Sequence, residues 1–277
     1  MTMDTVKQAG AEFWNANPCG GEWSNYREFA AWIQQTEPYA FSVLRKYDWQ
    51  NKRVVEVGCG QGTTLNYLPQ YGANVVGIDM SVGSILGARA GAQELEIVSK
   101  ISLAQGDAEK LPFADASCDC VISFGVLHHT SDTAAGIQEI YRLLKPGGRA
   151  IVMLYRSGNP KWWMTRLLRG YAWLVDQFTG EKFYLANRLR ARREAGNRAG
   201  TALLELFGVP VLKAFSNRQS SKMFTSFTNV KISNHSPGFR RLTDISSQLQ
   251  VLTPVFEWLD RSTQSMWGFY QVIEAQK

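Results

Sequence analysis

The residues most suggestive of chemistry are a glycine-rich loop and an aspartate seventeen positions after it. Residues 54–62 read Val-Val-Glu-Val-Gly-Cys-Gly-Gln-Gly, and Asp79 closes a second apolar run. In a doubly wound α/β sheet, such a turn lets the backbone approach a nucleotide-like ligand, and a carboxylate at the tip of the next strand meets the ribose hydroxyls. The pair predicts a site for an adenosine-bearing cofactor, although a glycine-rich turn alone also occurs without any ligand.

Three acidic residues extend this hypothesis. Glu56 ends a buried apolar strand, where a carboxylate is costly unless it is paired, so it suits a ligand that carries an amino-acid ammonium group. Asp79 either binds ribose or caps the helix that begins at Ser81. Asp107 follows the third strand and is either a turn aspartate or an acceptor for the adenine amino group.

The elements that position these residues alternate as short apolar runs and helical stretches. Strands are predicted near 53–57, 74–78, 100–104, 118–123 and 148–155, with two closing strands near 227–233 and 267–275. Helices are predicted near 62–70, 81–91 and 132–144. Residues 145–148, Lys-Pro-Gly-Gly, are predicted to stop a helix and turn into a strand. This rhythm is typical of a parallel sheet covered by helices.

Five motifs stand in a characteristic order: Glu56-x-Gly-x-Gly-x-Gly62, Asp79, Gly106-Asp-Ala-Glu-Lys-Leu-Pro-Phe113, Val126-Leu-His-His129 and Leu144-Lys-Pro-Gly-Gly148. With them, residues 50–155 and the closing strands resemble the class I S-adenosylmethionine-dependent methyltransferases, in the style of the ubiquinone/menaquinone C-methyltransferase-like group. The resemblance implies a Rossmann-like α/β fold with a seven-stranded sheet, order 3-2-1-4-5-7-6, whose last strand is antiparallel.

The resemblance also implies S-adenosyl-L-methionine as the cofactor. The glycine loop would lie under its methionine part, Asp79 would take the ribose hydroxyls, and Asp107 with Ala108 would meet the adenine. The implied cofactor-binding residues are Glu56, Gly58, Cys59, Gly60, Gly62, Asp79, Met80, Asp107, Ala108 and Phe124.

His128 and His129 are the catalytic candidates. They follow the fourth strand, beside the switch point of the sheet where ligands bind. A neutral imidazole can accept a proton from an attacking hydroxyl, amine or activated carbon. His129 is preferred as the base, with His128 also a substrate contact. The alternative is that a histidine here only packs or caps a helix.

Substrate choice is assigned to two segments outside the resemblance. Residues 1–50 are predicted to be an N-terminal helical lid, and residues 51–277 a methyltransferase domain with a helical substrate-cap insertion at about 156–226. Lid candidates are Phe13, Trp14, Tyr26 and Arg27, although aromatic residues in such a segment also pack helices onto the sheet. The predicted substrate contacts are Trp14, Tyr26, His128 and Trp162.

The net charge of +6 is concentrated in one segment, because residues 155–200 hold ten basic and three acidic residues. Its arginine run (Arg188, Arg190, Arg192, Arg193 and Arg198) suits a solvated helix face, an anionic small molecule or nucleic acid. Nucleic acid is disfavoured because no interleaved aromatics or RNA-binding module are present. Residues 161–178 suit packing on the domain, a homodimer contact, or a peripheral membrane contact.

The composition excludes several other classes. The chain has no apolar run long enough to span a membrane and no secretory leader, so it is expected to be cytoplasmic. Its four cysteines, at positions 19, 59, 118 and 120, fit no metal-ligand spacing, so no metal is expected.

The sequence thus predicts methyl transfer to a small hydrophobic or amphipathic molecule, at oxygen or carbon. Two alternatives are an RNA or protein methyltransferase that docks through the basic 156–200 segment, and a cofactor-binding partner subunit without activity. A nicotinamide oxidoreductase is disfavoured because Asp107 and the Lys-Pro-Gly-Gly motif have no role in it.

Overall fold

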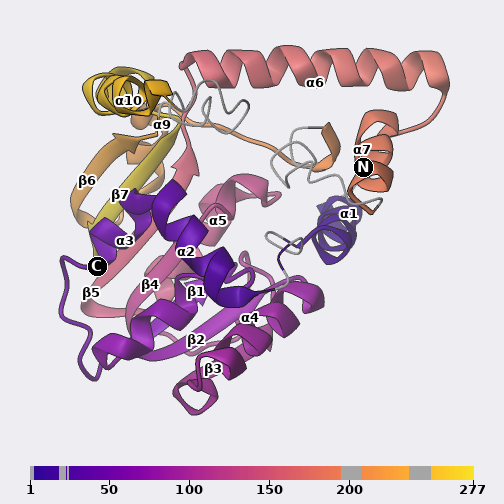
Figure 1. The fold of residues 1–277 in the computed structure, drawn as a ribbon. Coiled ribbons are helices and arrows are strands. Elements are labelled where there is room, and N and C mark those ends of the chain that lie inside the picture. The colour runs from indigo at the N-terminus through magenta and orange to yellow at the C-terminus, as the bar shows by residue number, and fades with distance from the viewer. Residues whose placement is uncertain (1–2, 19–22, 24, 195–206, 237–250) are drawn as a thin grey trace.

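The computed structural model describes residues 3–18, 23, 25–194, 207–236 and 251–277 (Figure 1). Its centre is a seven-stranded sheet in the order β3-β2-β1-β4-β5-β7-β6. Strand β7 is antiparallel to both of its neighbours, and the other pairings are parallel. The predicted fold class is therefore confirmed. The strands are β1 (Arg53–Val57), β2 (Asn74–Asp79), β3 (Ile101–Gln105), β4 (Cys118–Phe124), β5 (Leu144–Tyr155), β6 (Thr228–His235) and β7 (Tyr270–Gln276).

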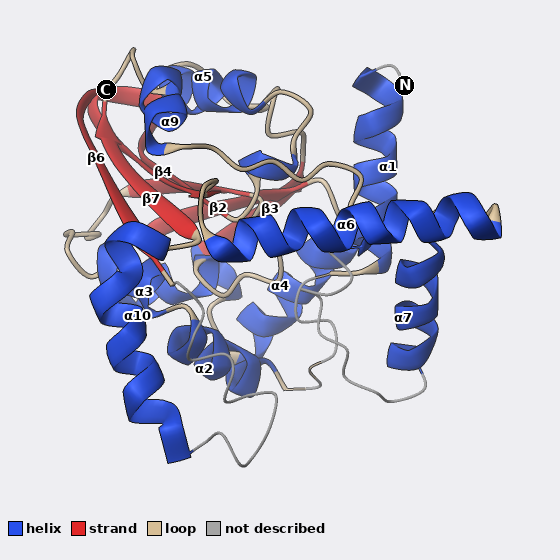
Figure 2. Ribbon diagram, turned by 90° about the horizontal axis from the view of Figure 1, so that it is seen from above, coloured by secondary structure: helices blue, strands red, loops and turns tan. Residues whose placement is uncertain are grey.

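Helices cover both faces of the sheet (Figure 2). The α-helices are α1 (Met3–Ala16), α2 (Tyr26–Thr36), α3 (Pro38–Leu44), α4 (Val82–Glu94), α5 (Thr133–Leu143), α6 (Pro160–Thr179), α7 (Tyr184–Glu194), α9 (Asn217–Met223) and α10 (Thr253–Trp267). Short 3-10 helices are η1 (Leu65–Tyr71), η2 (Val98–Lys100) and η3 (Leu127–His129). None of the described helices is both long and apolar enough to cross a membrane.

Alternation along the strands divides the core into two layers. Val54 of β1 faces a cluster with Leu44 of α3 and Leu65 of η1. Its neighbour Val55 faces the other cluster, with Ile140 of α5 among its members. The strand β1 is buried on both faces in the middle of the sheet, and its one buried polar side chain, Glu56, lies near its carboxyl end, where the site lies.

The segment after the glycine loop differs from the α-helix predicted over 62–70. It forms the 3-10 helix η1, which contains Pro69. Proline has no N–H to donate and its ring clashes with the preceding turn, so it breaks or kinks an α-helix. The shorter 3-10 turns accommodate this residue, and Gly72, with a φ of 80°, ends the segment.

Two further boundaries were predicted wrongly. Residues 145–148 belong to β5 instead of a turn before it; Gly147 has a φ of 79°, and the pairing of β5 with β4 shifts register between Cys118 and Cys120. Between these two pairs β5 has three more residues than β4, so this irregularity in the pairing takes up the segment that was expected to turn the chain. The last strand begins at Tyr270 and not near 267, because α10 continues to Trp267.

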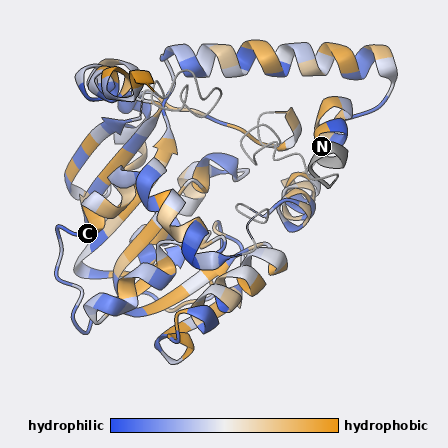
Figure 3. Ribbon diagram, viewed as in Figure 1, coloured by the Kyte–Doolittle hydropathy of each residue, from blue (hydrophilic) through white to orange (hydrophobic). Residues whose placement is uncertain are grey.

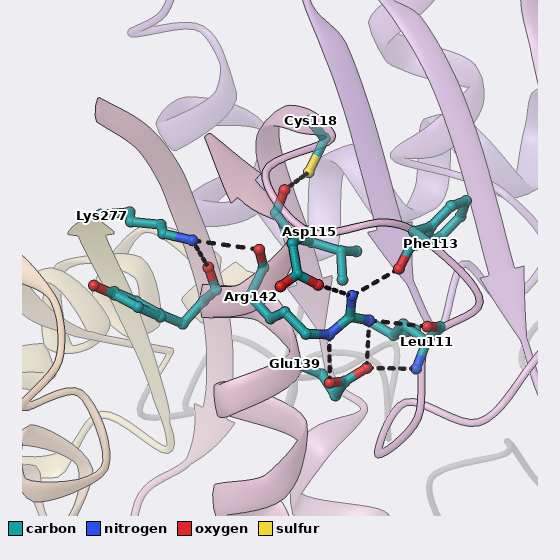
Figure 4. Close-up of polar contacts among 9 residues, drawn as sticks. Leu111, Phe113, Asp115, Cys118, Glu139, Arg142 and Lys277 are labelled. Atoms are coloured by element: carbon teal, nitrogen blue, oxygen red, sulfur yellow. Dashed lines mark hydrogen bonds and ion pairs between the residues drawn. The ribbon is translucent and has the colours of Figure 1, made fainter. Parts of the chain in front are cut away.

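Arg142 at the end of α5 fastens the loop that follows the third strand (Figure 4). Its guanidinium donates to the carbonyls of Leu111 (3.0 Å) and Phe113 (2.7 Å), and to the carboxylates of Glu139 (2.8 Å) and Asp115 (2.7 Å). Glu139 in turn accepts the Leu111 N–H at 2.7 Å. This loop continues directly from Asp107, so the network positions one wall of the site.

We expect Arg142→Ala to lower the free energy of unfolding by about 1–3 kcal/mol, because two carbonyls and two carboxylates lose a charged donor. Urea denaturation measures the change. The control is Arg89→Ala, since Arg89 is exposed on α4, and its effect should stay within about 0.5 kcal/mol. If the two substitutions lower the free energy of unfolding equally, the Arg142 hydrogen bonds do not stabilise the loop after the third strand.

Candidate functional site

The carboxyl ends of β1, β2 and β4 meet at a cavity of about 960 Å³. The helices α1, α2 and α6 contribute to its walls as well. Eleven of the predicted site residues line it: Trp14, Glu56, Gly58, Cys59, Gly60, Asp79, Met80, Asp107, Ala108, Phe124 and His129. Residues from six separate segments of the chain thus converge on one space.

At Gly58 the glycine loop approaches the residues after the neighbouring strand β4 too closely for any side chain. At Gly58, which has a φ of 72°, an added Cβ would lie 2.1 Å from the Val126 side chain. Gly60 also has a positive φ, of 52°. Its N–H donates to the Asp79 carboxylate at 2.9 Å. Glycine is therefore required both for the backbone conformation and for close approach.

Asp79 is held at the tip of β2 by backbone donors. One oxygen accepts the Gly60 N–H and the other accepts the Ser81 N–H, each at 2.9 Å. The cap of α4 is Ser81, whose hydroxyl accepts the Ser84 N–H. Burial raises the pKa of Asp79, while these backbone hydrogen bonds oppose the rise. Asp79 therefore joins two loops at the cavity wall and is not itself the helix cap.

Glu56 is a buried carboxyl on the cavity wall. Thr64 donates a hydrogen bond to one of its oxygens, and the other oxygen has no partner in the part of the chain that the structure describes. Burial raises the pKa of Glu56 to about 8, with a further contribution from the nearby Asp79 charge. An unsatisfied buried carboxyl oxygen that borders a cavity fits a ligand with a cationic hydrogen-bond donor.

Asp107 and Glu109 are bridged by a lysine from the N-terminal helix. Lys7 Nζ lies 2.6 Å from an oxygen of Asp107 and 2.8 Å from an oxygen of Glu109. The other Asp107 oxygen accepts the Glu109 N–H at 2.8 Å. Lys7 thus ties α1 to the loop after β3, across one side of the cavity.

The two adjacent histidines have different environments. His129 lines the cavity, and its Nδ1 lies 2.8 Å from the Val211 carbonyl oxygen. Because a carbonyl can only accept, Nδ1 carries the proton and the basic lone pair of the neutral ring is on Nε2. His128 is fully buried and stacks on Tyr155, with the two ring centroids 3.7 Å apart. Burial lowers its pKa well below the usual range, so it is neutral.

Four predicted site residues do not line this cavity: Gly62, Tyr26, His128 and Trp162. Tyr26 donates to the Gly62 carbonyl at 2.7 Å and accepts from Asn66 at 3.0 Å, so it supports the glycine loop from behind. Trp162 packs against the hydrophobic core. Of the lid candidates, Phe13 is buried beside Val209, and Arg27 is exposed and donates to the Glu94 carbonyl.

Sequence reasoning missed an apolar wall of the cavity and two lysines that line it, Lys7 and Lys161. The wall includes Trp23, Phe29, Trp32, Phe41, Tyr155, Phe269 and Tyr270. Lys161 also lines the cavity, with its ammonium 4.1 Å from the Phe269 ring centroid. The density of aromatic residues in 1–50 was the available signal, but it did not tell which rings face inward.

Comparison with known proteins agrees with this geometry. Residues 55–152 match the family model described as "Methyltransferase domain". The matched region, residues 55–152, is thus similar to the class I S-adenosylmethionine-dependent methyltransferase domains. S-adenosylmethionine is the cofactor of that family, and the site fits it. One Glu56 oxygen, which has no partner among the described residues, suits its ammonium group, and Gly60 offers open backbone beside Asp79.

Among curated relatives, a demethylmenaquinone methyltransferase of Beutenbergia cavernae is 36% identical over 43% of this chain and 47% of its own length. A ubiquinone biosynthesis O-methyltransferase of Alkalilimnicola ehrlichii is 33% identical, with the same two coverages. The chain thus spans about half the length of these relatives.

A solved structure of geranyl diphosphate C-methyltransferase from Streptomyces coelicolor has a TM-score of 0.57 at 15% identity, and the match covers 98% of this chain and 97% of that one. At this identity the similarity concerns the fold of the methyltransferase domain.

The raised pKa of Glu56 predicts a pH dependence of stability. Between its ordinary pKa of about 4.3 and about 8, the folded carboxyl keeps a proton that the unfolded chain has lost, so stability falls as the pH rises. The fall is at most about 1.4 kcal/mol per pH unit.

In Glu56→Gln, thermal unfolding without ligand should therefore depend less on pH between 5 and 8 than in the unmodified protein. Other titrating groups are common to both proteins and cancel in the comparison. If the unfolding temperatures of the two proteins change with pH in parallel over this range, Glu56 is not a buried, protonated group.

Proposed function

We propose that this protein transfers a methyl group from S-adenosylmethionine to a small hydrophobic or amphipathic molecule, at oxygen or carbon. One observation carries the proposal: a single cavity joins the carboxylates at the strand tips to His129 and to an apolar, aromatic wall. Ligand pockets occupy about 300–1,000 Å³, so a cavity of about 960 Å³ has room for a cofactor and a second molecule.

The cofactor would be held by the strand tips. Asp79 would accept the ribose hydroxyls and Glu56 the ammonium of the methionine part, above Gly58 and Gly60. Asp107 and Ala108 would meet the adenine. A carboxylate oxygen has more than one lone pair, so Asp107 can accept from the adenine amino group while it keeps its contact with Lys7.

The chain itself has to position and deprotonate the acceptor. S-adenosylmethionine, when bound, supplies a methyl group on a positively charged sulfur. The aromatic wall would exclude water and hold the acceptor in line with that methyl group. His129 Nε2 would take the proton of an attacking hydroxyl or activated carbon, while the Val211 carbonyl holds the ring through Nδ1.

Two structural segments support the proposed division of the chain. Lys7 and Trp14 of α1 line the cavity from the N-terminal segment, and Lys161 and Thr165 of α6 line it from the 156–226 insertion. These contacts support a lid and a cap that close over the acceptor. The names of the two curated relatives concern quinone-pathway enzymes, and the aromatic wall supports a comparably apolar acceptor here.

Labelling tests the acceptor class. The protein would be incubated with methyl-labelled S-adenosylmethionine and an extract of its source cells, and the label separated into organic, aqueous small-molecule, protein and RNA fractions. Label in the organic or small-molecule fraction supports the proposal. Label in protein or RNA would favour a macromolecular acceptor that docks on the basic 156–200 segment.

Asp79→Ala should weaken the binding of S-adenosylhomocysteine by about tenfold to a hundredfold, because buried ribose hydroxyls lose a charged acceptor. Isothermal titration calorimetry gives the dissociation constant. Asp119→Ala is the matched control, since Asp119 also accepts a backbone N–H (from Arg53, at 2.8 Å) but lies at the amino end of its strand. Unaltered affinity of Asp79→Ala would rule out the ribose contact.

His129→Ala should reduce turnover of the identified acceptor by about 10²–10⁴-fold, the usual contribution of a general base, with cofactor affinity unchanged. Single-turnover kinetics and calorimetry measure the two quantities. His235→Ala is the control, because that ring stacks on Tyr39 and does not line the cavity. Normal turnover in His129→Ala would exclude this residue as the base.

A further inference from the structure

Helix α6 presents an apolar stripe to solvent along its whole length. The stripe consists of Trp163, Met164, Leu167, Tyr171, Leu174 and Phe178, and their exposed fractions run from 48% to 90%. Residues of an α-helix are about 100° apart around its axis, so these six positions fall within an arc of about 100°. A continuous exposed stripe of this kind indicates a surface that contacts something outside the domain.

The position of α6 makes this stripe accessible. The helix has 20 residues, or about 30 Å of length, and lies along the upper edge of the molecule in Figure 1. Helix α10 lies next to the amino end of α6 in Figures 1 and 2. It exposes the side chains of Val255, Trp258 and Met266. Figure 3 shows hydrophobic residues recurring along α6.

The charge of the same segment identifies the partner. Helix α6 has three basic residues and one acidic residue, Asp176, whose carboxylate accepts the N–H groups of Phe183 and Tyr184. The guanidinium of Arg166 lies 5.3 Å from the Trp163 ring centroid, at the border of the stripe. Over residues 155–189, whose side chains the structure describes, six basic and two acidic residues give this segment a net charge of +4 (6 − 2).

We propose that the α6 stripe, with α10 beside it, docks this protein on the surface of an anionic lipid bilayer. Apolar and aromatic side chains beside basic ones on one helix are the features that hold a helix in the plane of a charged membrane interface. A second copy of the chain fits less well, because its matching face would carry the same positive charge.

The inner side of α6 connects this surface to the site. Thr165 lies about 150° around the helix axis from the middle of the stripe and Lys161 about 110°, and both line the cavity. A helix lying on a bilayer would therefore also form part of the cavity roof. If the proposed function holds, a lipophilic acceptor has a short path from the membrane; the docking itself does not depend on methyl transfer.

The test is flotation of the full chain with vesicles of phosphatidylcholine mixed with phosphatidylglycerol, compared with phosphatidylcholine alone. The protein should float with the anionic vesicles and much less with the neutral ones, and added salt should reduce the bound fraction. The double variant Leu167→Ser/Phe178→Ser should bind at least about tenfold more weakly, because two side chains no longer enter the interface.

A matched control keeps the result specific to α6. Leu86→Ser changes a side chain of similar exposure on α4, 60% against 69% for Leu167, away from the stripe. It should float like the unmodified protein, and circular dichroism should show that all variants are folded.

Three results would overturn the proposal. The first is that the protein does not float with anionic vesicles, the second that the double variant floats as well as the unmodified protein, and the third that Leu86→Ser loses as much flotation as the double variant. A dimer that sediments without lipid and dissociates in the double variant, together with no vesicle binding, would assign the stripe to a second copy. Cofactor affinity, measured in parallel, distinguishes failure of docking from failure of the proposed function.

Discussion

The site depends on how two carboxyl groups are accommodated at the ends of adjacent buried strands. Glu56 is the penultimate residue of β1 and Asp79 is the last residue of β2, and burial there raises the pKa of both. Backbone N–H groups from the glycine loop and from the start of α4 donate hydrogen bonds to Asp79 and so offset the cost of burying its charge. For Glu56 the cost of burial is offset only in part, because Thr64 donates a hydrogen bond to just one of its two oxygens. As a result, one Glu56 oxygen has no hydrogen-bond partner among the described residues, whereas both Asp79 oxygens are held by the loop backbone.

The same constraint explains why the glycine loop needs support from outside the sheet. Gly58 is packed against Val126 with no space for a Cβ, and Tyr26 of α2 donates to the Gly62 carbonyl. The N-terminal helices therefore have two roles. They hold the loop from behind, and through Lys7 and Trp14 they form one side of the cavity.

The insertion after β5 combines two surfaces on one helix. The inner side of α6 contributes Lys161 and Thr165 to the cavity, while its outer side is apolar and is bordered by basic residues. If the outer surface docks as proposed, a helix with this division would couple that contact to access to the site. Catalysis by positioning requires the exclusion of water, so a roof that closes against a lipid surface would serve both needs.

Local sequence was sufficient for the elements of the sheet and for the chemistry at its edge. Apolar runs predicted all seven strands, and the motif around Gly58, with Asp79 and Asp107, predicted residues that do line one cavity. These predictions succeed because a buried strand, a positive φ and a strand-tip carboxylate depend on residues within a few positions of one another. Pro69 also shows the limit, since an α-helix was expected over a segment that contains this helix-breaking residue and that forms a 3-10 helix.

The tertiary structure alone decided which side chains face the cavity. His128 and His129 are adjacent in sequence, yet one is buried against Tyr155 and the other meets the Val211 carbonyl, and both partners come from distant segments. Likewise, Tyr26 and Trp162 were expected at the substrate but pack against the loop and the core. The sequence determined which residues could do chemistry at the sheet edge. The packing of remote segments determined which of them reach the cavity, because burial depends on what covers a side chain and not on its neighbours in the chain.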